Sequence, residues 1–214
     1  MGIDLGGEHD EAELIARSKL GDLNAFNLLV ERYERPLYNL CLRMLSAPEA
    51  AEDATQDAFI AAYRAIGRFR GGVEPGGPAT GFRAWLFRIG ANACYDELRR
   101  RRSRPAISLD APRRESERTL DVPASSPTLE ERAESEEVGL AIQAALSALP
   151  PDQRLAVILC DVQDLDYAEI AQVMRVSLGT VKSRINRARS KLRTLLLART
   201  ELLPSRFRQS SGEK

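Results

Sequence analysis

YAEIAQVMRVSLGTVKSRINRARSKLR, residues 167–193, is the stretch that decides the fold of this chain. Its first third has apolar residues at helical spacing, a short break with Ser177 and Gly179 follows, and a basic helical segment then begins. Ser177 can cap the second segment, because a serine oxygen accepts a hydrogen bond from the free N–H groups of a first helical turn. The stretch therefore predicts two helices joined by a tight turn.

The second of these helices has an apolar stripe on one side and basic residues on the others. The stripe consists of Leu178, Val181, Ile185, Ala188, Leu192 and Leu195. Between positions 170 and 200 the sequence has no acidic residue and eight lysines or arginines. A helix-turn-helix places the start of its second helix in the major groove of DNA, whereas an ordinary bundle could carry the same helix as a solvated face. The candidate base readers are Thr180, Lys182, Ser183, Asn186 and Arg187.

Charge is distributed unevenly along the chain, although its formal sum is zero. Residues 1–104 have 15 basic and 15 acidic side chains, residues 105–137 have 4 and 9, and residues 138–214 have 12 and 7. The middle is therefore acidic and the end basic, which favours a nucleic-acid partner for the last segment. The middle is also rich in proline, serine and glutamate with few large apolar groups, so it is predicted to be a linker without a core of its own.

The cysteines and the apolar segments indicate where the protein works. Cys41, Cys94 and Cys160 lie far apart, each within an apolar helical pattern, and His9 is the only histidine. We therefore expect core thiols in a reducing compartment, with no disulfide, metal site or cofactor. No apolar run is long enough to span a membrane, and the N-terminus is acidic where a signal peptide would be basic, so we expect a cytoplasmic protein.

Residues 11–104 are predicted to form a first helical domain. A short helix over residues 11–20 is followed by a helical pattern over residues 26–45, which Pro36 should kink or divide. A turn is expected at residues 47–50, and the next helix begins with acidic and polar side chains. The helix dipole alone can explain this acidic start, and a docking surface is an equal alternative. Its candidate residues are Asp53, Gln56 and Asp57.

A loop and a further helix complete this first domain. GGVEPGGPATG, residues 71–81, is a loop by composition, and helical spacing resumes over residues 82–102, with Trp85 expected mainly in the core. The helix ends in a run of arginines. Cations suit a helix C-terminus, but the run exceeds what a dipole needs, so phosphate contact by Arg99 and Arg100 is the sharper interpretation.

Residues 138–200 are predicted to form a second domain of four helices that ends in the helix-turn-helix. Pro150 and Pro151 stop its first helix, and Pro151 can begin the next. No strand-like alternation of any length occurs, so the fold class is all-α. The sequence also lacks a phosphate-binding Gly-Lys motif and a serine, histidine and acid set. An enzyme would need Asp53, Asp57 and Asp96 around a metal, from separate helical segments.

Four motifs in order resemble the extracytoplasmic-function group of bacterial sigma factors, within the sigma-70 family. AFNLLVERY at residues 25–33 looks like region 2.1, and AEDATQDAFIAAYRAIGRFRG at residues 51–71 looks like region 2.2. FRAWLFRIGANACYDELRRRRSR at residues 82–104 looks like regions 2.3 and 2.4. ALPPDQRLAVILCDVQDLDYAEIAQVMRVSLGTVKSRINRARSKL at residues 148–192 looks like region 4.

The resemblance implies a protein that binds core RNA polymerase, at the largest-subunit clamp helices and the flap, and directs it to promoter DNA. Asp53, Gln56 and Asp57 match the positions that dock on the clamp helices, and Asn92 matches a position that captures a base flipped from the minus-10 element. The region 4 positions that read the minus-35 duplex match Lys182, Ser183, Asn186 and Arg187.

Family members also tend to be held inactive by an anti-sigma protein, so such a partner is expected. The glycine-rich loop over residues 71–81 looks longer than the family's usual one, which puts the minus-10 base preference in doubt. The main alternative from another class is a stand-alone helix-turn-helix regulator, which would bind its operator without polymerase.

Overall fold

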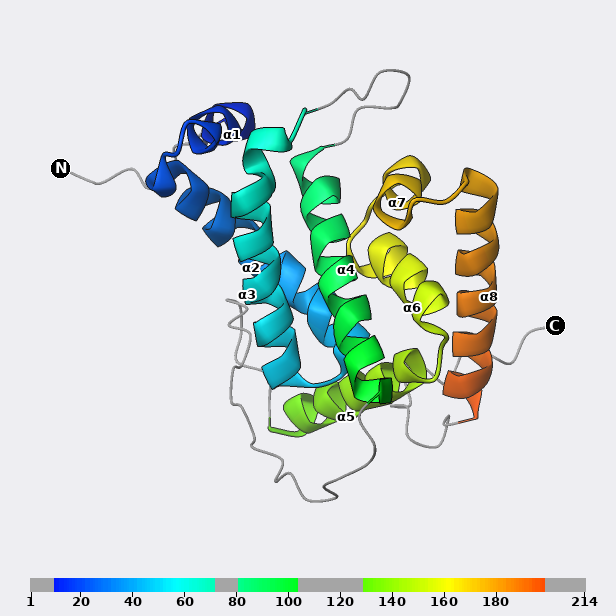
Figure 1. Cartoon of the computed structure of the whole chain (residues 1–214). Coiled ribbons are helices and arrows are strands. Elements are labelled where there is room, and N and C mark those ends of the chain that lie inside the picture. The colour runs from blue at the N-terminus through cyan, green and yellow to red at the C-terminus, as the bar shows by residue number, and fades with distance from the viewer. Residues whose placement is uncertain (1–9, 72–80, 104–128, 199–214) are drawn as a thin grey trace.

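The computed structural model describes residues 10–71, 81–103 and 129–198, and every regular element in them is helical (Figure 1). The all-α prediction is therefore confirmed. The elements are α1 (Glu11–Lys19), α2 (Leu23–Leu45), α3 (Pro48–Ala65), the 3₁₀ turn η1 (Ile66–Arg68), α4 (Phe82–Ser103), α5 (Leu129–Ser147), α6 (Pro151–Val157), the π-helical turn η2 (Ile158–Val162), α7 (Tyr167–Met174) and α8 (Leu178–Leu197).

Three predicted boundaries differ from the structure. α2 is a single helix through Pro36, so the predicted division into two helices does not occur. α3 begins at Pro48, within the predicted turn, because proline is well suited to the first turn of a helix. α5 begins at Leu129, so residues 129–137, which the sequence placed in the linker, are helical.

The first unit, α1 to α4, is a bundle around the long helix α2. Its core includes an aromatic cluster in which Trp85 is buried against Phe69 and Phe82, with ring centroids 5.0 and 5.5 Å away. Trp85 is thus a core residue, as predicted. Gly90 lets α4 approach α2 closely, because a side chain there would come within 2.5 Å of a Leu37 methyl. Cys41 and Cys94 are fully buried, as predicted, whereas Cys160 is only partly buried.

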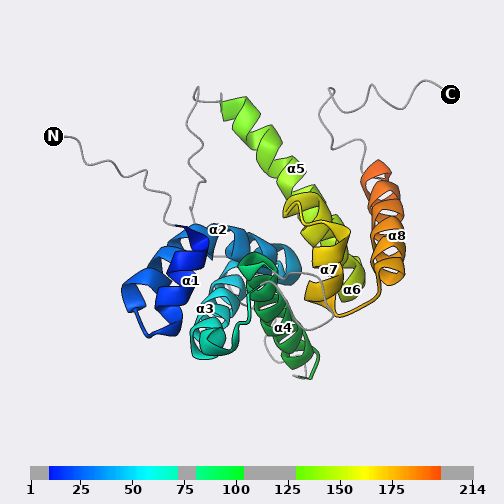
Figure 2. The same ribbon diagram turned by 90° about the horizontal axis from the view of Figure 1, so that it is seen from above.

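The second unit, α5 to α8, packs directly against the first. α4 and α7 are in contact, as are α2 and α5, and the view from above shows the two bundles side by side (Figure 2). Gln163 donates to the carbonyl of Pro36 at 3.0 Å, while Gln143 donates to the carbonyl of Arg43 at 3.1 Å. Both of these hydrogen bonds join the second unit to α2, and on α4 Arg83 donates to the carbonyl of Gln163.

Arg154 is the buried centre of this contact. Arg154 is 7% exposed, and its guanidinium donates to the carbonyls of Met44, near the end of α2, of Ser147, the last residue of α5, and of Leu149, two residues further on. Free carbonyls at two helix C-termini thus share one cation, which the helix dipoles favour. Burial lowers the pKa of Arg154, and its Nε has no partner within the described residues. One side chain therefore fastens the two units.

Candidate nucleic-acid interface

The turn between α7 and α8 is built from three residues at positions 175–177. Asp166 caps α7 in a reciprocal capping box with Glu169, and Arg175 ends that helix in the left-handed conformation, with φ of 54°. Ser177 then caps α8 by accepting a hydrogen bond from the N–H of Thr180 at 3.2 Å. The predicted helix-turn-helix and its serine cap are both present.

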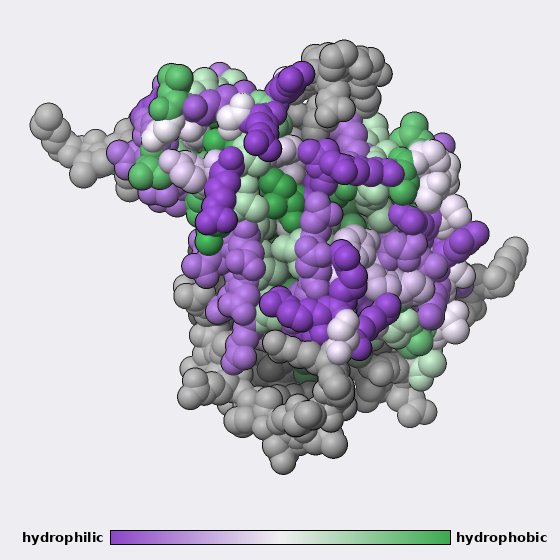
Figure 3. Space-filling view, viewed as in Figure 1, coloured by the Kyte–Doolittle hydropathy of each residue, from purple (hydrophilic) through white to green (hydrophobic). Residues whose placement is uncertain are grey.

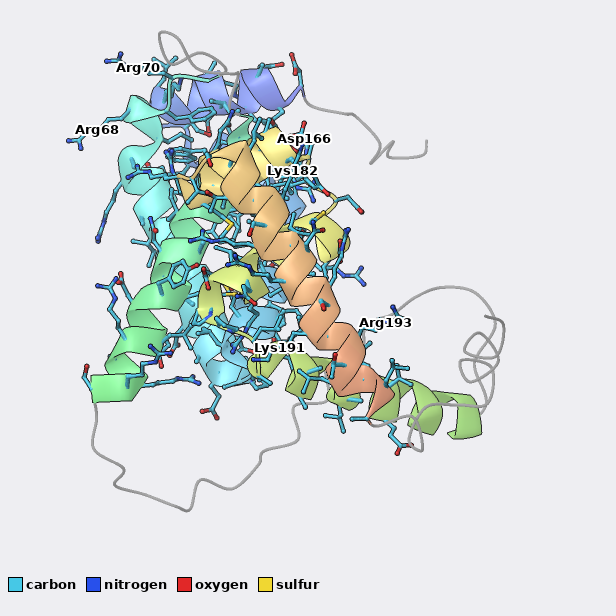
Figure 4. All side chains as sticks on the ribbon, turned by 90° about the vertical axis from the view of Figure 1, so that its right-hand side faces the viewer. Arg68, Arg70, Asp166, Lys182, Lys191 and Arg193 are labelled. Atoms are coloured by element: carbon cyan, nitrogen blue, oxygen red, sulfur yellow. The ribbon has the colours of Figure 1, made fainter. Side chains whose placement is uncertain are left out.

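α8 packs on the rest of its unit through Val181, Ile185 and Ala188, which are fully buried. Lys182, Asn186 and Arg187 are exposed, and Lys182 lies near the start of α8 in Figure 4. The predicted readers Thr180 and Ser183 are partly covered but lie on the same first turns. The structure thus places all five predicted readers within the first half of one helix.

Leu178 is an exception to the predicted apolar stripe. It is the first residue of α8, and its side chain is 50% exposed rather than buried. Residue spacing indicates the direction of a side chain but not whether another element lies opposite it. The exposed fraction shows that no described element fully covers this leucine.

Two arginines of α8 form ion pairs with α6 and with η2, the π-helical turn that follows it. Arg184 Nε lies 3.0 Å from Asp152 of α6, and Arg189 pairs with Asp161 of η2. The hydrogen bonds from Arg189 lower the pKa of Asp161 below its ordinary 3.8. These pairs position α8, whereas Lys182 and Arg187 have no ion pair within the described residues.

Asn92 lies on the exposed face of α4, near the middle of the helix. It lines a groove of about 610 Å³ between the two units, whose other walls include Tyr95 and Arg102 of α4 and Pro151 and Asp152 of α6. Neither Tyr95 nor Arg102 was among the predicted site residues. Tyr95 follows Asn92 by three positions, so helical spacing could have placed both on one face.

The arginines at the end of α4 are exposed, and two acids of the same helix pair with three of them. Arg99 pairs with Asp96 at 2.6 Å, and Arg100 pairs with Glu97. Glu97 also accepts from Arg101, and this hydrogen bond is the main cause of its lowered pKa. The predicted phosphate contacts of Arg99 and Arg100 would have to compete with these acids.

Asp53, Gln56 and Asp57 are all exposed on α3, and none has a hydrogen bond or ion pair within the described residues. The two aspartates line a groove of about 370 Å³ between α3 and α4, which also contains Asn92. Figure 3 shows this groove as a pale green strip between hydrophilic side chains of α3 and α4. Its apolar lining comes from Ala50, Ala54, Ala58, Ala61, Ile89 and Ala93.

Asp96 lines the same groove as Asp53 and Asp57. These are the three aspartates that a metal-dependent enzyme would need in this chain. They nevertheless form no cluster that could hold a metal ion, within the residues described. The predicted loop at residues 71–81 falls almost wholly outside the described residues, which include only its two end glycines.

Both halves of the chain match known families. Residues 29–104 match the model of sigma-70 region 2, and residues 139–192 match that of sigma-70 region 4. The ECF RNA polymerase sigma factor SigM of Mycobacterium tuberculosis is 37% identical over 196 residues, covering 91% of this chain and 89% of SigM. The chain belongs to the extracytoplasmic-function sigma factors of the sigma-70 family. It is an RNA polymerase sigma factor, and sigma factors are not a class of enzyme.

Other relatives and two solved structures agree with this assignment. The ECF RNA polymerase sigma-E factor of Escherichia coli is 36% identical, covering 82% of this sigma factor and 88% of its own length. CnrH, solved in complex with the cytosolic domain of CnrY, has a TM-score of 0.61 at 29% identity and covers 88% and 97% of the two chains. The sigma factor RpoE of Bartonella quintana, solved with the anti-sigma factor NepR, has a TM-score of 0.58 at 26% identity, with coverage of 81% and 98%.

Among the described helices, none is long and apolar enough to cross a bilayer.

Proposed function

We propose that this sigma factor docks on core RNA polymerase through Asp53, Gln56 and Asp57 and reads the promoter at two separate places. α8 would read the minus-35 element as duplex, and Asn92 would hold a base of the melted minus-10 element. Core polymerase would supply the catalysis, the clamp helices and flap would be the docking partners, and the bacterial cytoplasm would be the compartment.

The observation that carries the docking proposal is the exposed, unpaired acidic face of α3. Two carboxylates one helical turn apart point to solvent beside a groove lined with alanines, and no described residue neutralises them. The carboxylates complement a partner surface with lysines or arginines, and the alanine-lined groove complements a narrow apolar ridge on that partner. Because α3 begins at Pro48, these three residues lie beyond its first turn, where the helix dipole no longer accounts for acidic side chains.

The proposed DNA contacts follow from the chemistry of each surface. Asn92 offers an amide that can hydrogen-bond a base edge, and the neighbouring Tyr95 ring gives a base something to stack on. α8 offers an uncovered basic start that fits the major groove. The predicted alternative, a stand-alone regulator, has no support, because both family matches are to sigma-70 regions.

An anti-sigma factor is proposed as a further partner. RpoE, one of the similar structures, is bound to the anti-sigma factor NepR. We extend this kind of partner to the present chain without assigning its binding surface.

Co-purification with bacterial core RNA polymerase tests the docking surface. The tagged chain should capture core polymerase stoichiometrically, and the triple variant Asp53→Ala/Gln56→Ala/Asp57→Ala should lose it. The matched control is Asn27→Ala/Glu31→Ala/Glu34→Ala, which removes one amide and two carboxylates from the exposed face of α2. Capture by the α3 variant would reject the docking surface, whereas no capture by the unmodified chain would favour the stand-alone regulator.

A further inference from the structure

Leu178 is an apolar side chain exposed within the surface proposed to read DNA. Half of it is accessible, although the next members of its stripe, Val181 and Ile185, are fully buried. Its neighbours along the chain, Ser177, Gly179 and Thr180, contribute no large apolar side chain. The other exposed leucines among the described residues are Leu20, Leu23, Leu140 and Leu197, and none of these lies at the start of a basic helix.

The position of Leu178 limits what can cover it. Leu178 and Lys182 are four residues apart, so they lie on the same side of α8, one turn from each other. No acidic residue occurs between positions 170 and 200, so the local charge favours an anionic partner. Around Gly179 the space is open, since a side chain there would meet only the Ser177 hydroxyl, at 3.9 Å. The start of α8 is therefore free to approach a nucleic acid closely.

The major groove offers only one apolar group for such a side chain. Each base pair presents hydrogen-bond donors and acceptors there, and thymine alone adds a 5-methyl group. The first residues of a recognition helix are those that reach the base edges. A leucine here stabilises the complex when it contacts a methyl group. Against a polar base edge it would instead leave a hydrogen-bonding group without a partner.

We infer that Leu178 reads the 5-methyl group of one thymine in the minus-35 duplex, as a specificity-determining residue next to Lys182. The inference rests on the proposed reading of that element by α8. The inference adds an apolar contact to α8, whose other proposed DNA contacts are hydrogen bonds and ionic contacts.

The test uses holoenzyme assembled from the full chain and bacterial core RNA polymerase. Holoenzyme first selects its preferred minus-35 duplex from a pool randomised at that element. Each thymine of the selected duplex is then replaced by deoxyuridine, which lacks only the 5-methyl group. Binding is measured for the unmodified chain, for Leu178→Ala and for the matched control Leu197→Ala. Leu197 is 47% exposed at the other end of α8, roughly 28 Å away at 1.5 Å per residue.

We expect one thymine at which deoxyuridine weakens binding about fourfold, as for one apolar carbon left in water. The loss should occur for the unmodified chain and for Leu197→Ala, and it should be absent for Leu178→Ala, because the methyl group and the leucine form one contact. If every thymine tolerates deoxyuridine, or if the loss persists in Leu178→Ala, the inference is wrong while the reading by α8 stands. If holoenzyme selects no duplex sequence, the proposed function itself fails.

Discussion

α4 and α8 are both rich in arginine, yet their cations are held in opposite ways. The arginines at the end of α4 pair with Asp96 and Glu97 of the same helix. The acids that hold α8 lie on other elements, at Asp152 of α6 and Asp161 of η2. Pairs within one helix neutralise a surface locally, whereas pairs between elements fix the position of a helix and leave its free cations available.

This difference separates two ways of binding DNA. Affinity for duplex DNA depends on lysines and arginines that displace counterions from phosphates, and the start of α8 provides these without competing acids. α4 instead places a single amide, Asn92, beside Tyr95 in a groove. A partly neutralised surface with an amide and a ring suits an unstacked base more than a duplex.

Removing Arg154 should have the largest effect, because it removes the buried cation that helps to join the unit containing α4 to the unit containing α8. Arg154→Ala leaves three carbonyls without their donor at a buried site, so we expect the free energy of unfolding to fall by about 3 kcal/mol. Urea unfolding measures this loss, and small-angle X-ray scattering should show a larger radius of gyration as the units separate.

The control for Arg154 is Arg193→Ala on α8, which removes an exposed guanidinium that has no ion pair within the described residues. It should change the free energy of unfolding by less than about 0.5 kcal/mol. An Arg154→Ala variant with unchanged stability and dimensions would mean that this arginine does not fasten the units.

Much of this fold could be predicted from the sequence, because helical spacing and capping residues are local signals. The serine cap of α8 and the core position of Trp85 were both predicted correctly. The role of Arg154 was not, since a single arginine in an apolar helix gives no sign of the carbonyls it will meet. Those carbonyls come from residues 44, 147 and 149, and only the packing of two units brings them together.

The candidate site was predictable to a similar extent and for the same reason. Sequence spacing placed the five readers on one helix and the acidic face on another. It could not separate Arg184, which pairs with Asp152, from Arg187, which has no ion pair in the part of the chain that the structure describes. Sequence spacing also assigned Leu178 to the buried stripe, because periodicity does not show which positions another element covers. Ion pairs and coverage between elements depend on tertiary structure.

The contrast between held and free cations on α8 can be tested with Arg187 and Arg184. Arg187→Ala should weaken binding of holoenzyme to the minus-35 duplex by about 1 to 3 kcal/mol if the side chain contacts a base edge. Arg184→Ala removes the pair with Asp152 and should change stability more than base preference. Competition binding with single-base substitutions distinguishes them, and equal losses of specificity in both variants would contradict the contrast.

The proposed role of α4 in melting can be tested with Asn92→Ala. Loss of an amide that hydrogen-bonds a captured base should lower open-complex formation about fivefold, for roughly 1 kcal/mol, with minus-35 binding unchanged. Permanganate reactivity of promoter thymines measures the opening. The matched control is Asn27→Ala, an exposed amide on α2. An undiminished open-complex yield in Asn92→Ala would remove this residue from base capture.

The smallest expected change in stability concerns the ion pair between Arg189 of α8 and Asp161 of η2. The hydrogen bonds from Arg189 keep the pKa of Asp161 below 3.8 in the folded chain. The pair's contribution to stability is therefore fully present above that value and is lost as the pH falls through the lowered pKa of the folded state. Since both side chains are partly exposed, Asp161→Asn should lower the free energy of unfolding at pH 7 by only about 0.5 kcal/mol.

Urea unfolding of the unmodified chain and of Asp161→Asn at pH 7, 5 and 3 measures this contribution. The difference between them should be constant from pH 7 to pH 5 and should shrink at pH 3, as the carboxylate takes up a proton. Asp164→Asn is the control: Asp164 has no ion pair within the described residues, and its φ of 51° is one that asparagine also tolerates. A difference for Asp161→Asn that persists at pH 3 would show that this aspartate supports α8 by its shape and hydrogen bonding rather than by its charge. The contrast between α4 and α8 would then rest on Arg184 and Asp152 alone.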